Sequence, residues 1–336
     1  MTQERKQHEN EQAAHPARFY NMDAVDGCRQ HLADGAVDLV VTDPPYGIDG
    51  TTLHKHYNRK EDLVVDGYVE VDRKDYPAFT RRWIAEAARI LRPGGALFAL
   101  SGYTNLRHLL AALADSGLLE RNHIIWKYNF GVYTRKKFVS SHYHVLYWVK
   151  PGPNPTFRQD ARFAQPERDP DGRSLLYRDL EDVWIINREY KPGRAKNKNE
   201  LPTALLVKIL QYASRENDLV CDLFLGGFNT ARVAVGMNRR IVGFERGRKP
   251  FEHGLGIMAN VKPGGLLPSL KRPRGQAPRN QGKPWAAEEI RRLRARFLAL
   301  REEGRTKQDA VASLCEEFGR GRFAVDRILR AEPGGP

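Results

Sequence analysis

The chain has 336 residues and a net charge of +14. That length is ample for one full α/β core with a smaller module, and the positive balance favours a polyanionic partner without saying which one. The three cysteines, Cys28, Cys221 and Cys315, show no pairing pattern, which indicates a reducing, cytoplasmic location. No apolar run is long enough to span a bilayer, so no membrane contact is expected. Residues 1–17 are predicted to form a disordered polar tail and not a signal peptide.

Residues 37–41 are mostly apolar and predict a largely buried parallel strand. The strand runs into Asp43-Pro44-Pro45-Tyr46, where two prolines fix the backbone and hold one carboxylate at a set distance from one aromatic ring. The ring can stack on a flat base, while Asp43 and a prolyl carbonyl accept hydrogen bonds from an exocyclic amino group. An ordinary Asp-Pro turn after a strand is the alternative, since short motifs also arise by chance.

Two later segments combine basic and aromatic residues. Residues 49–74 are expected to form a mobile loop that orders over such a base, and residues 126–137 suit contacts with phosphates and unstacked bases. For the second segment, an amphipathic loop at a sheet edge is an equal alternative. The histidines of the first segment have no further Cys or His at ligand spacing, so no metal site is predicted. The basic residues that we expect to contact DNA here are Lys55, Arg59, Lys127, Arg135, Lys136 and Lys137.

A second motif lies far downstream. Residues 219–221 predict a strand, residues 222–230 a glycine-containing turn, residues 231–238 a helix, and residues 241–244 a second strand that ends at Glu245. In a doubly wound sheet, such a turn lets the backbone approach a ligand, and the acid after the second strand binds ribose hydroxyls. Glu245 follows the turn by about 20 residues, as this arrangement expects.

The clearest boundary lies at residues 262–284, whose prolines, glycines and basic residues predict an extended linker. Residues 285–331 show three short helical patterns, and a Gly-Arg-Gly break before the last one suits a helix-turn-helix. Half of the net charge lies in the fifth of the chain that begins at residue 271. We expect Arg322, Arg327 and Arg330 to contact DNA. A helical dimerisation module with a solvated charged face is the alternative.

Together the two motifs resemble those of DNA amino-methyltransferases that use S-adenosylmethionine, in the permuted group whose catalytic motif precedes the cofactor motif. The resemblance covers roughly residues 18–260. It includes residues 84–100, which are similar to the helix, turn and strand that support the pocket, and residues 141–148, which resemble the strand lining the target-base pocket. The departures from the family pattern are Leu223 for a proline, Phe228 for the second glycine of the cofactor turn, and Tyr143 for a glutamate.

The resemblance implies an α/β fold at residues 18–261, with a doubly wound, mostly parallel, Rossmann-like methyltransferase sheet, followed by a small C-terminal helical module. It implies S-adenosyl-L-methionine as the cofactor, with Asp23 at its adenine. It also adds His142 to the expected DNA contacts. The implied catalytic residues are Asp43, Pro44, Pro45 and Tyr46. The implied cofactor-binding residues are Asp23, Asp43, Asn199, Leu201, Asp222, Phe224, Gly226, Gly227, Thr230 and Glu245.

Such a site has to activate an exocyclic amino group for methyl transfer. An exocyclic amine is a poor nucleophile because its lone pair is delocalised into the ring. Hydrogen bonds to Asp43 and to the Pro44 carbonyl would favour a tetrahedral nitrogen, with Tyr46 stacked on the flipped base. Carbon-5 methylation of cytosine needs a thiolate, and no cysteine here follows a proline as in those enzymes.

The expected activity is methylation of adenine N6 in double-stranded DNA, because the family pairs aspartate in this motif more often with adenine. Methylation of cytosine N4 stays open, as does an inactive DNA-binding regulator on the same fold. A homodimer and a separate restriction endonuclease partner also stay open.

Overall fold

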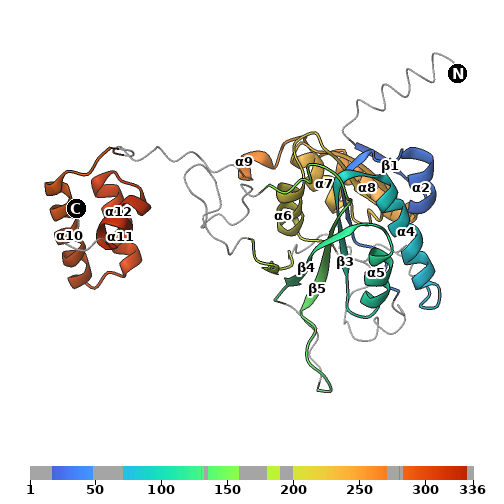
Figure 1. Cartoon of the computed structure of the whole chain (residues 1–336), viewed down its shortest axis with the longest axis horizontal. Coiled ribbons are helices and arrows are strands. Elements are labelled where there is room, and N and C mark those ends of the chain that lie inside the picture. Colours follow the sequence, from blue (N-terminus) through green and yellow to red (C-terminus); the bar gives the residue numbers. More distant parts are fainter. Residues whose placement is uncertain are drawn as a thin grey trace, which may run out of the picture. The chain divides into compact units, whose positions relative to one another are not determined.

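The computed structural model describes residues 17–47, 71–129, 131, 135–158, 180–189, 200–270, 280 and 283–330. The chain divides into two compact units, Met1–Lys271 and Arg272–Pro336, and each is described by itself. Figure 1 labels their helices and strands.

The described strands of the first unit form one eight-stranded sheet in the order β1-β8-β7-β2-β3-β5-β4-β6. Strand β5 runs antiparallel to both of its neighbours, and every other pairing in the sheet is parallel. The strands are β1 (Ala17–Tyr20), β2 (Val37–Thr42), β3 (Leu91–Ser101), β4 (Leu119–Lys127), β5 (His142–Val149), β6 (Val183–Ile185), β7 (Leu219–Asp222) and β8 (Arg240–Phe244). The predicted doubly wound, mostly parallel fold is therefore confirmed.

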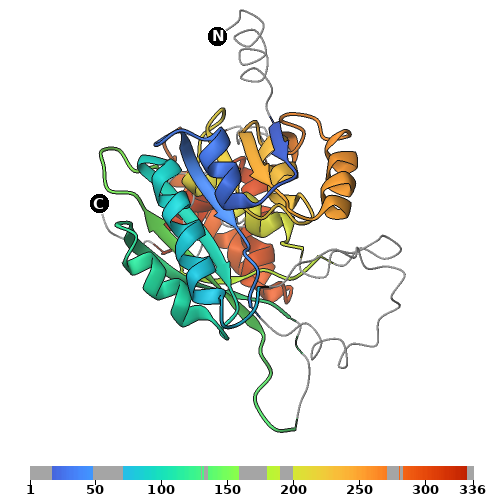
Figure 2. The same ribbon diagram turned by 90° about the vertical axis from the view of Figure 1, so that its right-hand side faces the viewer.

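Helices cover both faces of this sheet, as Figures 1 and 2 show. One face packs against α2 (Ala24–His31), α4 (Tyr76–Ile90) and α5 (Leu106–Ala114). The other packs against α6 (Thr203–Ala213), α7 (Asn229–Gly236) and α8 (Arg248–Met258). Strand β2 shows why both faces are buried: Leu39 and Val41 enter one core, and Val40 enters the other. Parallel strands with near-continuous apolar sequences are typical of this arrangement.

The segment expected to begin the linker belongs instead to the first unit. Residues 262–270 include α9 (Leu267–Leu270), and the leucines at 266, 267 and 270 pack against the core beside α7. The Leu266 N–H donates to the Gly236 carbonyl at 2.8 Å. Three leucines within five residues give this stretch an apolar face. The prolines and glycines of the same stretch had favoured an extended linker instead. Residues 271–279 of the expected linker lie outside the described ranges.

The second unit contains α10 (Ala287–Glu302), α11 (Lys307–Phe318) and α12 (Arg322–Arg330) around its own small apolar core. The Thr306 hydroxyl accepts from the Asp309 N–H at 3.2 Å and caps α11. The helix ends at Gly319, whose φ of +59° suits glycine, and α12 begins three residues later. Buried Arg320 in this turn pairs with Glu289 of α10 at 2.8 Å.

In the part of the chain that the structure describes, no helix combines the length and apolar composition that crossing a bilayer requires. Within the same ranges, no group of three or more His, Cys, Asp or Glu side chains is arranged to hold a metal ion.

Candidate active site

The two sequence motifs meet at the carboxyl edge of the sheet. Strand β2 pairs with β7 through Leu39–Val220 and Val40–Cys221, so both strands end at the same edge. There the buried Thr42 hydroxyl donates a hydrogen bond to the Asp222 carboxylate, with 3.1 Å between Oγ1 and Oδ1. Residues 180 positions apart in sequence are thereby joined directly. Carboxyl ends of adjacent parallel strands are where such sheets bind ligands.

The turn expected to be catalytic, residues 43–46 and called the catalytic turn below, presents one carboxylate and one ring. Asp43 and Tyr46 are both half-buried, and the Tyr46 hydroxyl donates to Asp43 Oδ1 at 2.6 Å. The buried Asn105 amide supports the turn from behind, donating to the Tyr46 carbonyl at 2.6 Å and to the Gly47 carbonyl at 3.1 Å. Gly47 has φ +62°, and a Cβ there would lie 2.4 Å from the Tyr76 ring. The backbone of this turn is therefore tightly fixed.

The turn expected to bind the cofactor, residues 222–230, begins with Asp222, and Glu245 after β8 reaches it through the Gly226 N–H. Asp222 is 3% exposed, and its Oδ1 also accepts from the Phe224 N–H at 3.1 Å. Burial raises the pKa of Asp222 to about 6, although hydrogen bonds from Thr230, Phe224 and Thr42 oppose that shift. Burial also raises the pKa of Glu245. The two oxygens of the Glu245 carboxylate accept from the Gly226 N–H at 2.9 Å and from the Gly247 N–H at 2.6 Å.

Phe228, which stands in place of a glycine, keeps the backbone conformation that glycine favours. Its φ is +60°, in the left-handed region, and it directly precedes α7. Its fully buried ring packs against Phe19 at 4.9 Å and Phe251 at 6.0 Å between ring centroids. A Cβ at Gly254 would lie 2.1 Å from this ring. A side chain in the left-handed region costs about 1–2 kcal/mol, which this apolar packing offsets.

The remaining predicted cofactor residues fall around the same edge. The Leu201 carbonyl accepts from the Asn229 amide at 2.8 Å, which joins the start of α6 to the start of α7. Phe224 is half-buried and contacts Trp83 edge-on at 5.9 Å. Asp23 caps α2, accepting from the Val25 and Asp26 N–H groups. Gly226 and Gly227 are half-buried and Thr230 is buried, whereas Asn199 lies outside the described residues.

An aromatic cluster beside the catalytic turn was not predicted as a unit. The rings of Trp126, Tyr128 and Tyr143 lie 5.5–5.6 Å apart. The Arg188 guanidinium covers them at 6.0, 4.8 and 5.3 Å, respectively. Tyr143 also contacts the Tyr46 ring at 5.7 Å, so the cluster adjoins the catalytic motif. Sequence gives no signal for Arg188 or for Asn105, because their roles arise only when distant strands come together.

The predicted DNA contacts are distributed over two places. Lys127, Arg135, Lys136, Lys137 and His142 are exposed at the ends of β4 and β5 and in the loop between them, beside the catalytic edge. Arg322, Arg327 and Arg330 are exposed on α12 of the second unit. Lys55 and Arg59 lie outside the described residues.

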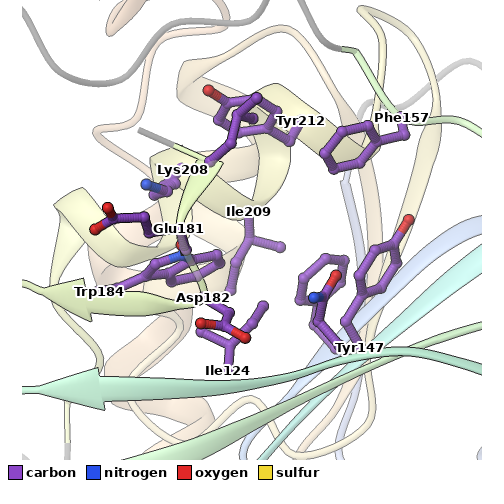
Figure 3. A pocket seen from close by; sticks show the side chains of 12 residues that line it. Ile124, Tyr147, Phe157, Glu181, Asp182, Trp184, Lys208, Ile209 and Tyr212 are labelled. Carbon is purple, nitrogen blue, oxygen red and sulfur yellow. The ribbon is translucent and has the colours of Figure 1, made fainter. Parts of the chain in front are cut away.

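An aromatic hollow of about 50 Å³ lies elsewhere on the sheet, between β4, β6 and α6 (Figure 3). Tyr147, Phe157, Trp184 and Tyr212 line it, with the Lys208 ammonium 5.0 Å from the Trp184 ring centroid. None of the predicted site residues lines this hollow. The converging polar groups of the carboxyl edge make that edge the better candidate site.

Comparisons with known proteins agree with this geometry. The N6/N4 methyltransferase family model, described as DNA methylase, matches residues 37–253. The type II methyltransferase M.HpaI of Haemophilus parainfluenzae is 24% identical over 234 residues, which cover 66% of this chain and 68% of that protein. The DNA adenine methyltransferase YhdJ of Escherichia coli K12 is 27% identical over 234 residues, covering 66% and 75% of the two chains.

Solved structures share the fold. The Thermus thermophilus protein TTHA0409, a putative DNA modification methylase complexed with S-adenosyl-L-methionine, gives a TM-score of 0.52 at 22% identity, covering 74% of this chain and 95% of that one. The cytosine-N4-specific PvuII DNA methyltransferase gives a TM-score of 0.55 at 15% identity, covering 76% and 91%. The M1.HpyAVI–SAM complex gives 0.51 at 19% identity, covering 72% and 98%.

Proposed function

Because this chain belongs to the N6/N4 DNA methylase family, we propose that it transfers a methyl group from S-adenosylmethionine to the exocyclic N6 of a flipped adenine in double-stranded DNA. The single observation that carries the proposal is the Thr42–Asp222 hydrogen bond, because it sets the catalytic turn directly beside the cofactor turn. The naming of YhdJ as an adenine methyltransferase supports adenine as the target.

The residues of the cofactor turn fit S-adenosylmethionine by their chemistry. The Glu245 carboxylate, held by two backbone N–H groups, has lone pairs left to accept from ribose hydroxyls. Asp222 and Glu245 place negative charge where a cationic cofactor would gain from it, and Leu201 is assigned to the methionine end. The bound cofactor supplies an electrophilic methyl group on a sulfonium.

The catalytic turn acts on the target base. Asp43 and the Pro44 carbonyl accept hydrogen bonds from the exocyclic amine, which favours a tetrahedral nitrogen with an available lone pair. The Tyr46 ring stacks on the flipped base, and its hydroxyl releases Asp43 Oδ1 when the amine arrives. Asn105 keeps the turn in place through two carbonyls, so positioning and fixed dipoles lower the barrier.

Two alternatives concern the same site. The fold shared with the PvuII enzyme keeps cytosine N4 as a second target. An inactive DNA-binding regulator is disfavoured, since Asp43, Tyr46, Asp222 and Glu245 are all gathered at one edge.

To test this, the purified protein is incubated with S-adenosylmethionine and DNA. The DNA is then digested to nucleosides, which are identified by mass spectrometry. N6-methyladenine is expected. N4-methylcytosine would move the target to cytosine. If neither product forms and calorimetry detects no cofactor binding, the proposed methyltransferase activity is wrong and the protein is an inactive DNA-binding regulator. Sequencing of the methylated DNA then gives the recognition site.

We also assign DNA contact to the second unit, because Arg322, Arg327 and Arg330 are exposed on α12 after a short turn from α11. A chain ending at Lys271 keeps α9, which packs on the core, and should bind cofactor normally. Its DNA affinity should fall, and each lost phosphate contact should reduce the log–log salt slope by about 0.9. An unchanged affinity and slope, with a lower mass by light scattering, would instead identify a dimerisation module.

We expect a cytoplasmic location, where DNA is accessible and the cysteines stay reduced. The likeness to a type II methyltransferase favours a separate restriction endonuclease as partner, which the genes beside this one would reveal.

A further inference from the structure

The loop between β4 and β5 carries a bare aromatic ring. Phe138 is 98% exposed, more than any other large hydrophobic side chain of the described residues. Figures 1 and 2 show residues 135–141 of this loop, in green, projecting beyond the start of β5. Strand β4 is antiparallel to β5, which is antiparallel to β3, so β4 runs in the same direction as β3 and β2 and ends on the side of the catalytic turn. An isolated exposed ring is common on proteins, so its neighbours decide whether it has a role.

The neighbours of Phe138 are cationic. Arg135, Lys136 and Lys137 precede it directly, and all three are exposed. This combination disfavours an apolar protein partner, because burying the ring would also desolvate three charges. It suits duplex DNA, which offers phosphates to the cations and stacked bases to the ring.

Contacts link this loop to the rim of the catalytic turn. The Lys137 ammonium lies 3.4 Å from the Tyr103 hydroxyl, and Tyr103 follows the end of β3. A Cβ on the preceding residue, Gly102, would lie 3.8 Å from both the Tyr46 and the Tyr143 rings. DNA that delivers a base to Tyr46 therefore passes within reach of the loop.

We propose that Phe138 is a wedge that enters the base stack at the position vacated by the flipped base, while Arg135 and Lys136 hold the adjoining phosphates. Flipping breaks the stacking of the target base and leaves a gap in the duplex. An aromatic ring that fills the gap recovers stacking and slows the return of the base. The inference rests on the proposed function, since only an enzyme that flips its base has use for a wedge.

The test uses the full-length protein with S-adenosylhomocysteine and a duplex carrying the recognition site, with 2-aminopurine at the target position. Unstacking of 2-aminopurine on flipping raises its fluorescence. Phe138→Ala should lower both the fluorescence increase and the DNA affinity, the affinity by about tenfold or more. Phe138→Trp should retain both. Removing the base opposite the target abolishes the pairing cost, so on that duplex Phe138→Ala should regain the fluorescence.

Two controls separate stacking from other effects. Leu298→Ala removes another exposed apolar side chain, in the second unit, and should change neither signal. Lys136→Ala should reduce the salt slope of binding by about 0.9, whereas Phe138→Ala should leave the slope unchanged. Equal melting temperatures would show that the variants fold.

The outcomes are distinct. Unchanged fluorescence in Phe138→Ala, an equal loss on both duplexes, or a reduced salt slope would overturn the wedge. No fluorescence increase with the parent protein, together with no methyl transfer, would overturn the proposed function instead.

Discussion

The catalytic turn and the cofactor turn both carry acids at one edge of the sheet, but they hold them differently. Asp43 is half-buried and accepts a hydrogen bond from the side chain of Tyr46. Glu245 accepts from the backbone N–H groups of Gly226 and Gly247, and buried Asp222 accepts from the Phe224 N–H as well as from the Thr42 hydroxyl. A side chain can rotate away during a reaction, whereas a backbone donor in a fixed turn cannot. The first arrangement suits an acid that changes partner, and the second suits constant recognition of a ligand.

The largest effect is expected at Asp43. Asp43→Ala should lower the rate of methyl transfer by about 10²–10³-fold, because a preorganised group beside the reacting amine is lost. Single-turnover methylation measures the rate. Cofactor affinity by calorimetry should change far less than the rate, since Glu245 and its backbone donors are untouched. Asp43→Asn keeps one acceptor oxygen and should retain part of the rate. Near-normal turnover of the alanine variant would remove Asp43 from the chemistry.

Glu245→Ala should act on binding instead. Loss of a carboxylate that accepts from ribose hydroxyls should raise the cofactor dissociation constant by about 10–100-fold, with DNA affinity unchanged. Calorimetry with S-adenosylmethionine gives the first quantity and fluorescence anisotropy the second. Glu245→Gln is the matched variant. Its side chain has one oxygen and one NH2 group, so the NH2 group would face the N–H of either Gly226 or Gly247, where a hydrogen-bond acceptor is needed. Unaltered cofactor affinity in a folded variant would place the ribose elsewhere.

Asp222 should show a conflict between function and stability. Its folded-state pKa of about 6 lies above the ordinary 3.8, so the folded protein binds more protons than the unfolded chain between these values. Stability contributed by this group is therefore present below pH 3.8 and is lost as the pH rises through 6. Asp222→Asn should be more stable than the parent by about 2 kcal/mol at pH 8, while binding cofactor more weakly.

Urea unfolding at several pH values measures this effect on the free energy of unfolding. The advantage of Asp222→Asn should disappear by about pH 4, near the ordinary pKa of an aspartate. A difference that is constant with pH would mean that Asp222 does not titrate in this range.

Tyr46→Phe should give the smallest effect. The ring that stacks on the base is kept, and only the hydroxyl that donates to Asp43 in the absence of DNA is removed. Turnover should change by less than about tenfold, since one hydrogen bond contributes about 1 kcal/mol. Tyr46→Ala removes the ring as well and should lose far more. If Tyr46→Phe were as impaired as Tyr46→Ala, the hydroxyl itself would take part in the reaction.

The sequence predicts the elements that depend on local patterns. Apolar runs at 37–41, 219–221 and 241–244 correspond to β2, β7 and β8. The pairing of β2 with β7 then brings the two motifs to the same edge of the sheet.

Other features depend on contacts that no local pattern encodes. Asn105 reaches the catalytic turn from the start of α5, and Arg188 reaches the aromatic cluster from beyond β6. The start of the linker was misplaced because its leucines pack on α7 only in the folded unit. Asp23, assigned to the cofactor adenine by resemblance alone, also caps α2, a role that its position before an apolar helix would have suggested.

The ring of Phe228 has a consequence for how relatives of this chain can vary. It fills the space over Gly254, where even a single carbon would lie 2.1 Å away. Relatives that keep glycine at the position of Phe228 leave that space empty and should carry a larger residue at the position of Gly254. The two positions should therefore covary across the family, and a swap at either one alone should be tolerated less well than a swap at both.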